Sequence, residues 1–426
     1  MSSIKIQGGY SLKGTVKPMP NKNSILKIIP AAILAEGPVL IHNVPKSTSV
    51  RILIQIFKDL GGKVSYPKEG SIRLDGSTIR TSAVNEELAM KERSSFMFLG
   101  PLISRFGDSS IKDGGGCKLG NRPLDTMFKG LEDLGVEIDK GDGYKLKTKG
   151  LVGSTVWLLE ASVTGTENLV LAAVKAKGTT TIYNAACEPH TQDLCNFLNS
   201  IGARIQGIGT NKLVIEGVEY LTGGEWTIIA DHIDVGGLIV TAAVTGGELL
   251  IKNAIPEHMT QIINNFAKLN LKVEVRDKDI FVPGNQELIA HPNIKGDIDK
   301  IKDEPWPGFP VDLIPQALIL ALKAKGNIRV YSNMYEVQLI ELFAELFKMN
   351  SKMMLTNPNQ IVTFGPTTFK GTRVNASTIL QCTHALILAG LAAEGTTIVN
   401  DADIIYRRFP EIIPTLKKLG AKIEEI

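Results

Sequence analysis

AKGTTTIYNAACEPHTQDLCNFLNSIGARI, residues 176–205, shows most clearly the pattern from which the fold can be predicted. It joins a glycine that ends an apolar segment to a short β-like run, a polar turn, an amphipathic stretch, a second glycine and a further short run. This order predicts a strand, a helix and another strand, with a helix end at each glycine, where a positive φ is needed. One such unit cannot bury its apolar face alone, so neighbouring copies are expected.

The same pattern occurs six times along the chain, at intervals of about 70 residues with one longer gap before the fifth copy. Six units in 426 residues predict an α/β protein of two domains with three units each, in which helices pack on sheets of mixed direction. The alternative is an ordinary open α/β sheet without a repeat. The opening glycines are Gly37, Gly107, Gly178, Gly246, Gly326 and Gly395.

The charge and hydropathy patterns narrow the possible partners. Forty-seven basic against 44 acidic side chains leave a net charge of +3, with no separate basic block, so no nucleic-acid partner is expected. The polar first 15 residues have no apolar leader segment, and no apolar run approaches the length of a membrane span. We therefore expect a cytoplasmic protein without a membrane partner, and no obligate protein partner is inferred.

Metal, hydrolase and dehydrogenase motifs are not found in the sequence. The 4 cysteines form no Cys-x-x-Cys pair, and the 6 histidines form no His-x-x-x-His pair, so neither a metal nor another cofactor is expected. No Gly-x-Ser-x-Gly elbow and no Gly-x-Gly-x-x-Gly fingerprint after a strand occurs.

The second copy departs from the others through an insertion around KDGGGCKLGNRP, residues 112–123. Inserted glycine-rich loops commonly contact ligands. Cys117 follows three glycines in this loop, and the nearby Lys118 and Arg122 would lower the pKa of its thiol, which makes it a candidate acid or nucleophile. The alternative is an incidental surface thiol. The three other cysteines, Cys187, Cys195 and Cys382, are interpreted as packing residues.

Two helix starts are candidate anion sites. Asp125 stands in a position to cap the helix that follows the inserted loop, where Arg122 and free backbone N–H groups would face the same volume as Cys117. Lys22 and Asn23 begin the first long apolar helix, and a lysine there opposes the helix dipole unless an anion such as phosphate compensates for it. The alternatives are a simple helix start and a solvated lysine.

Two further candidates lie in the second half of the chain. Asp312, in EPWPGFPVDLIPQ, is either a helix N-cap or a carboxylate held at a proline-rich turn and suited to act as a general base. Arg407 and Arg408 precede the last helix, where either could reach an anion between domains or simply be solvated.

Several motifs along the chain carry a resemblance to one family. They are KNSIL, RSSFMFLGPLISRFG, GGCKLGNRPLDTMFKGLEDLG, SVTGTENLVLAA, NAACEPHTQDLCNFLNSIGA, PGFPVDLIPQ and RRFPEIIPTLKKLGA. On these motifs the chain resembles the UDP-N-acetylglucosamine 1-carboxyvinyltransferase family and, more distantly, enolpyruvylshikimate-phosphate synthase. The resemblance implies transfer of the enolpyruvyl group of phosphoenolpyruvate to the 3-hydroxyl of UDP-N-acetylglucosamine in peptidoglycan precursor synthesis, with release of phosphate.

The resemblance also implies a fold and a domain division. Each domain would be an inside-out α/β barrel of three repeated units. One domain would span residues 22–231 and carry the reactive cysteine loop, and the other would combine residues 1–21 with 232–426. The active site would lie in the cleft between them.

The resemblance assigns roles to individual residues. Cys117 would protonate the methylene carbon of phosphoenolpyruvate and could form a covalent adduct, and Asp312 would take the proton of the attacking hydroxyl. Lys22, also catalytic, would hold phosphate and carboxylate together with Arg122 and Arg407. The other residues expected to line the substrate pocket are Asn23, Arg93, Pro123, Leu124, Asp125, Thr126, Ser162, Val163, Thr164, Gly165 and Met334.

Two positions depart from the family pattern. Gln338 stands where an arginine is usual, and a second usual arginine is replaced near Thr378 to Gln381. These changes keep two alternatives open. One is the same chemistry on another uridine nucleotide or UDP-sugar, and the other is a UDP-sugar-binding paralogue without turnover.

Overall fold

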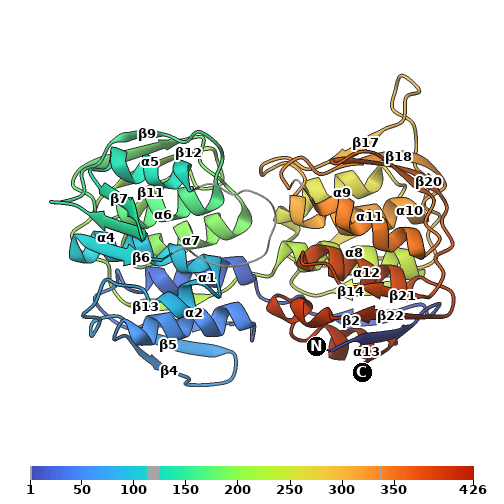
Figure 1. Cartoon of the computed structure of the whole chain (residues 1–426), viewed down its shortest axis with the longest axis horizontal. Helices are drawn as coiled ribbons and strands as arrows, with labels where there is room; N and C mark the ends of the chain where they lie inside the picture. Colours follow the sequence, from blue (N-terminus) through green and yellow to red (C-terminus); the bar gives the residue numbers. More distant parts are fainter. Residues whose placement is uncertain (1, 113–123, 336) are drawn as a thin grey trace. The chain divides into compact units, whose positions relative to one another are not determined.

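The computed structural model describes residues 2–112, 124–335 and 337–426, which form two compact units (Figure 1). Among these residues, the first unit comprises 20–112 and 124–229, and the second unit comprises 2–19 with 230–426. Each unit has a hydrophobic core of its own. The protein is therefore an α/β protein of two separately packed bodies.

The first unit contains three successive copies of the repeat. Its elements are β3 (Val39–His42), β4 (Lys63–Ser65), β5 (Ser71–Asp75), β6 (Asp108–Ile111), β7 (Glu137–Gly141), β8 (Gly143–Lys147), β9 (Thr155–Trp157), β10 (Thr179–Tyr183), β11 (Arg204–Gln206), β12 (Lys212–Glu216), β13 (Gly224–Thr227), α1 (Lys22–Ala31), α2 (Thr48–Asp59), α3 (Glu86–Ala89), the 3-10 helix η1 (Arg93–Phe98), α4 (Leu99–Phe106), α5 (Asp125–Asp133), α6 (Val163–Ala173) and α7 (Pro189–Ser200).

The second unit contains the other three copies and the first two strands of the chain. Its elements are β1 (Ile4–Gln7), β2 (Lys13–Val16), β14 (Glu248–Ile251), β15 (Glu274–Arg276), β16 (Asp279–Val282), β17 (Lys300–Lys302), β18 (Gly326–Tyr331), β19 (Met353–Asn357), β20 (Gln360–Gly365), β21 (Arg373–Asn375), β22 (Thr396–Asn400), β23 (Lys422–Glu425), α8 (His232–Thr245), α9 (Thr260–Ala267), α10 (Ile314–Lys323), α11 (Gln338–Lys348), α12 (Leu380–Leu391), α13 (Ile412–Lys418) and the 3-10 helices η2 (Pro256–His258), η3 (Val311–Leu313) and η4 (Ala402–Arg407).

Each copy of the repeat has a sheet of mixed direction, as the sequence pattern predicts. In the described residues, five sheets have four strands, in which a parallel edge strand precedes three antiparallel neighbours. Their orders are β13-β3-β5-β4, β9-β10-β12-β11, β2-β14-β16-β15, β17-β18-β20-β19 and β21-β22-β1-β23. The sixth sheet, β6-β8-β7, has an isolated parallel bridge between Ala83 and Ser110 in place of the edge strand.

The first two strands complete sheets that are otherwise built from the second half of the chain. Strand β1 lies between β22 and β23, where Ile6 is opposite both Thr397 and Ile423, and β2 pairs with β14. Ser3 and Ile426 exchange two backbone hydrogen bonds of 3.0 and 2.8 Å. In Figure 1 the blue N-terminal segment accordingly lies among the red C-terminal elements of the second unit.

The first helices of the repeats form the interior of the second unit. Helices α8, α10 and α12 pack against one another, and each also contacts strands of its own sheet. Every residue of α12 is buried, and α8 and α10 are nearly as buried. Their apolar residues extend around the whole helix, which suits a helix that is covered on all sides.

The predicted left-handed residues at the helix ends are confirmed with one exception. All six residues that follow the second helix of a repeat have a positive φ, as do five of the six opening glycines. The exception is Gly37, which does not have a positive φ. There the constraint is a close backbone approach, because an added Cβ would lie 3.3 Å from the backbone nitrogen of Gly223.

The two places where the chain passes between the units are paired through their backbones. The N–H of Asp231 donates to the carbonyl of Met19, and the N–H of Asn21 donates to the carbonyl of Ile229, both at 2.8 Å. The N–H of Met19 also donates to the Asp234 carboxylate at 2.7 Å. Burial raises the pKa of Asp234 to about 7, although the bond from Met19 favours the charged form.

Replacing Asp234 with Asn tests whether burial raises the pKa of the Asp234 carboxyl group. Native Asp234 binds a proton between about pH 4 and 7 that the unfolded chain does not hold, so its contribution to stability falls as the pH rises through that range. Asn keeps an acceptor for Met19 but does not titrate. We expect Asp234→Asn to gain stability relative to wild type from pH 4 to 7, by up to about 4 kcal/mol in denaturant unfolding.

The exposed Asp401→Asn variant is the control, and its stability should follow the wild-type pH dependence. Parallel curves for wild type and Asp234→Asn would contradict the burial effect.

Candidate active site

The predicted site residues divide between the two units. Cys117, Arg122 and Pro123 lie outside the described residues. Lys22, Arg93 and the helix starts of α5 and α6 belong to the first unit, whereas Asp312, Met334 and Arg407 belong to the second.

Lys22 is the first residue of α1, as the sequence predicts, and Asn23 follows it. The helix is capped by Asn21, whose side chain accepts a hydrogen bond of 3.1 Å from the N–H of Ser24. Burial alone would raise the pKa of Glu92, but the charge of Lys22 and hydrogen bonds from serines outweigh this effect and lower it. A carboxylate of the protein therefore lies within electrostatic reach of the Lys22 ammonium group.

Arg93 follows Glu92 directly and begins η1, which packs against α1. Its side chain is half-buried, and its guanidinium carbon lies 6.0 Å from the centre of the Phe96 ring. Lys22 and Arg93 therefore lie on two packed elements, with the Glu92 carboxylate near Lys22. Two cationic side chains and one carboxylate leave a net positive charge on these two elements, which suits an anionic ligand.

The first turns of α5 and α6 lie side by side. Ser162 caps α6, because its Oγ accepts a 3.2 Å hydrogen bond from the N–H of Gly165. A Cβ added to Gly165 would lie 3.6 Å from the Cα of Met127 in α5, so the helices meet closely at this point. The structure thus brings together two groups of predicted residues, Leu124 to Thr126 and Ser162 to Gly165, the latter including Val163 and Thr164.

The predicted cap of α5 is wrong. Asp125 is the first residue of this helix, and Leu124 occupies the N-cap position without a side-chain hydrogen bond. Asp125 is exposed and Thr126 is buried. The carboxylate of Asp125 is one position too far along the chain to cap the first turn. Its negative charge still interacts favourably with the helix dipole there.

Asp312 belongs to a cluster of four side chains in the second unit. Its Oδ1 accepts a 2.7 Å hydrogen bond from Nε2 of Gln381, and its Oδ2 accepts a 2.9 Å bond from Nη1 of Arg408. The other side of the Arg408 guanidinium donates three hydrogen bonds of 2.8 to 3.1 Å to Asp231. Asp231 also caps α8 through the N–H of Ile233.

These contacts decide between the alternatives that the sequence leaves open for Asp312 and for Arg408. The side chain of Asp312 bonds Gln381 and Arg408, and neither η3 nor α10 has a side-chain cap, so the N-cap interpretation is wrong. Arg408 is only 4% exposed, so the interpretation of this arginine as solvated is also wrong. Arg407 is the last residue of η4 and is half-buried.

Asp231 and Gln381 are absent from the predicted binding residues. The helix-capping role of Asp231 could have been predicted by comparing the repeats. Asn21, Ser162 and Asp231 each precede the first helix of a repeat, and each caps that helix. The hydrogen bond between Gln381 and Asp312 could not be predicted from local sequence, since 69 residues separate the two.

Met334 and Gln338 lie on the loop after β18 and at the start of α11. Met334 is 43% exposed, while its N–H and that of Asn333 donate to the buried Asp303 carboxylate at 2.8 and 2.7 Å. Gln338 is fully buried, and its Oε1 accepts a 2.9 Å hydrogen bond from Ser332. The backbone of Asn333 and Met334 is thus fixed by Asp303, while Met334 stays exposed.

The three described cysteines are buried and form no disulfide, which confirms their interpretation as packing residues. Burial raises the pKa of the Cys187 thiol to about 11 and raises those of Cys195 and Cys382 as well. None of these three is a good nucleophile at neutral pH.

Two kinds of feature are absent from the described residues. They contain no group of three or more histidine, cysteine or acidic side chains placed to hold a metal ion. In the same residues, no helix is both long and apolar enough to cross a bilayer.

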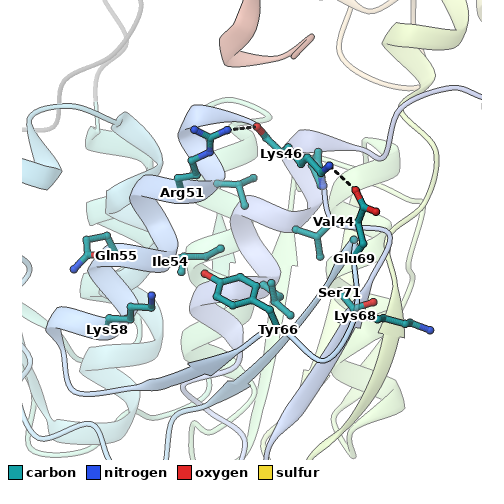
Figure 2. A pocket seen from close by; sticks show the side chains of 14 residues that line it. Val44, Lys46, Arg51, Ile54, Gln55, Lys58, Tyr66, Lys68, Glu69 and Ser71 are labelled. Carbon is teal, nitrogen blue, oxygen red and sulfur yellow. Dashed lines mark hydrogen bonds and ion pairs between the residues drawn. The ribbon is translucent and has the colours of Figure 1, made fainter. Parts of the chain in front are cut away.

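A surface hollow of about 650 Å³ lies on the first unit, between α2 and the β4–β5 hairpin (Figure 2). Lys46, Arg51, Lys58 and Lys68 line it, and Lys46 donates a 2.6 Å hydrogen bond to Glu69. None of the predicted site residues that the structure describes lines this hollow, so it is a feature distinct from those residues.

The chain belongs to the EPSP synthase (3-phosphoshikimate 1-carboxyvinyltransferase) family, whose family model matches residues 6–416. Members of this family are carboxyvinyl, or enolpyruvyl, transferases, so the prediction of an enzyme of this class is confirmed.

Within this class, the chain is similar over its whole length to proteins named UDP-N-acetylglucosamine 1-carboxyvinyltransferase. The relative from Bacteroides thetaiotaomicron is 39% identical over 100% of both chains, and that from Finegoldia magna is 38% identical over 100% of this chain and 99% of its own. The family resemblance expected from the motifs is therefore confirmed.

Solved structures show the same fold. The enolpyruvyl transferase NikO from Streptomyces tendae has a TM-score of 0.88 at 21% identity and covers 100% of this chain and 99% of its own. EPSP synthase from Acinetobacter baumannii has a TM-score of 0.78 at 20% identity and covers 100% of both chains.

Ser162→Ala tests the cap that shapes the first turn of α6. Loss of the acceptor costs about 1 kcal/mol locally, so exchange of the Gly165 amide should become about fivefold faster. Site-resolved hydrogen exchange measures this change. Ser162→Thr keeps an acceptor and is the control, and equal Gly165 exchange in the two variants would show that the Ser162 cap is unimportant.

Proposed function

We propose that this enzyme transfers the enolpyruvyl group of phosphoenolpyruvate to the 3-hydroxyl of UDP-N-acetylglucosamine and releases phosphate, a step in peptidoglycan precursor synthesis. The observation that carries the proposal is the set of full-length relatives, 36 to 39% identical, that bear the name of this activity. Its substrates would be phosphoenolpyruvate and a UDP-sugar.

The chemistry follows from the acid and base that the family resemblance assigns. The acceptor oxygen adds to C2 of phosphoenolpyruvate while Asp312 takes the hydroxyl proton and Cys117 gives a proton to the methylene carbon. The tetrahedral intermediate then loses phosphate and one methyl proton, which restores the vinyl group. Asp312 is accessible enough for this role, because its side chain remains 17% exposed.

Cations and helix starts would hold the charged parts of the substrates. Lys22, Arg122 and Arg407 are assigned to the phosphate and carboxylate of phosphoenolpyruvate. The adjoining first turns of α5 and α6 support the assignment of the UDP-sugar to Leu124–Thr126 and Ser162–Gly165, since helix N-termini favour anions.

The proposal includes the finer architecture and the use of both units. The buried first helices and the surrounding sheets support an inside-out α/β barrel of three repeats in each unit. Because Lys22 and Asp312 belong to different units, the proposed reaction requires that both units contribute to one substrate complex. No cofactor is part of the proposed reaction.

Phosphate release from phosphoenolpyruvate by the purified protein tests the function. We expect release with UDP-N-acetylglucosamine and none without an acceptor. UMP and other UDP-sugars serve as alternative acceptors. Release only with one of them would replace the proposed acceptor, and release with none of them would contradict the enzyme assignment and favour a binding paralogue.

Cys117→Ala tests the assigned acid. Turnover should fall by at least about 100-fold, because general acid catalysis is lost, while UDP-N-acetylglucosamine binding measured by calorimetry should change little. Cys187→Ala, which removes a buried thiol of raised pKa, is the control and should keep its turnover. Full turnover in Cys117→Ala would remove the acid role from this residue.

A further inference from the structure

Both carboxylate oxygens of Asp312 are held by side chains from distant parts of the second unit. Gln381 near the start of α12 holds Oδ1 at 2.7 Å, and Arg408 just after η4 holds Oδ2 at 2.9 Å. Each carboxylate oxygen has about two acceptor positions, so one position on each oxygen remains for another donor. The contacts therefore orient the carboxylate without using up its capacity to accept a proton.

Arg408 is itself fixed by Asp231. The Nε and Nη2 groups donate to the two oxygens of Asp231 at 2.8 to 3.1 Å, which leaves Nη1 for Asp312. Asp231 is fully buried and belongs to the start of α8, where it also bonds the N–H of Ile233. A guanidinium that is bonded along both edges has a fixed orientation, which a lysine could not reproduce.

The cluster places one positive charge between two carboxylates. Despite its burial, Arg408 has a raised pKa because Asp231 and Asp312 stabilise its charged form. Burial would raise the pKa of Asp231, but Arg408 outweighs this effect and lowers it. Both groups therefore remain charged at neutral pH.

Other titratable groups surround the cluster. Burial lowers the pKa of both His232 and His384 to about 3, so neither carries a positive charge at neutral pH. Asp234 also lies within electrostatic reach of Asp231 and Arg408. Arg407, which precedes Arg408 in the chain, is half-buried. Arg408 places a cation directly on Asp312.

Burial differs between the two carboxylates in a way that suggests different roles. The Asp231 side chain is 0% exposed, whereas that of Asp312 is 17% exposed. Here the residues that hold Asp312 are buried while Asp312 itself is accessible to a ligand.

We propose that Arg408 and Gln381 are positioning residues for Asp312, which fix the direction of the free acceptor positions of its carboxylate toward the hydroxyl proton. The inference rests on the proposed function, in which Asp312 is the general base. It adds two residues that touch the base rather than the substrate, and it gives Asp231 the role of anchoring Arg408.

The test uses the full-length protein with the double substitution Asp231→Asn and Arg408→Gln. The single Arg408→Gln variant would leave Asp231 buried without its counter-ion, which endangers folding. In the double variant the pair is neutral, and Asn can still cap α8. Gln381→Met is a second variant that removes the other donor without changing any charge. The exposed Arg276→Gln is the matched control for loss of an arginine.

We expect the double variant to lower kcat by about tenfold to 1,000-fold, less than the loss of a general base, with KM for UDP-N-acetylglucosamine within about twofold. Gln381→Met should also lower kcat with little change in this KM, and Arg276→Gln should change neither quantity.

The possible outcomes separate the two proposals. If the wild type is active and both cluster variants keep its kcat, the positioning role is overturned while the proposed function stands. If the double variant fails to fold, the Gln381→Met variant alone tests the positioning role. An unchanged kcat in Gln381→Met then overturns the inference. If the wild type releases no phosphate with any acceptor, both proposals fail, because Asp312 then has no hydroxyl proton to take.

Discussion

A helix that is apolar on every side must be covered on every side, and this requirement organises the whole protein. Helix α12 has no exposed residue, and α8 and α10 are nearly as buried, so none of them could exist in water without its neighbours. Each contacts strands of its own sheet on one side and the equivalent helices of other repeats on the other. Burial of such apolar surface contributes roughly 25 cal/mol per Å² and favours three copies in each unit.

The same interior also fixes the position of the polar residues of the candidate site. The starts of α1, α6 and α8 carry Asn21, Ser162 and Asp231 at equivalent positions, where each caps a helix. Neighbouring residues, among them Lys22 and Gly165, are thereby held at the ends of rigid helices. A site built in this way is more exact than one built on loops alone.

Local patterns in the sequence predict much of this fold. The glycine-strand-helix-glycine pattern predicts the six units, and the positive φ of residues such as Gly61 and Asn270 confirms the predicted helix ends. Gly37 could not be distinguished from the other opening glycines, because its constraint is contact with Gly223, far along the chain. The placement of Asp125 was missed for a different reason, since helix starts are defined only to within a residue or two by sequence.

The Asp312 cluster shows what a linear sequence leaves undetermined. Asp312 is 96 residues from Arg408, and Arg408 is 177 residues from Asp231, so their contacts depend on the packing of η3, η4, α8 and α12. The resemblance to a family identified Asp312 and Arg407 but gave no reason to choose between a solvated and a buried Arg408. That choice follows from tertiary structure, because a buried guanidinium requires carboxylate partners in three dimensions.

The position of β1 determines when its sheet can form during synthesis of the chain at the ribosome. Residues 20–229 contain all the described strands of the first unit, so that unit can assemble while the rest of the chain is still being made. Strand β1 is synthesised before them, yet its partners β22 and β23 are the last two strands of the chain. At typical elongation rates of about 5 to 20 residues per second, the first segment waits tens of seconds for its sheet. Its alternating polar residues and its short length protect it during that interval, because such a strand is a poor template for aggregation.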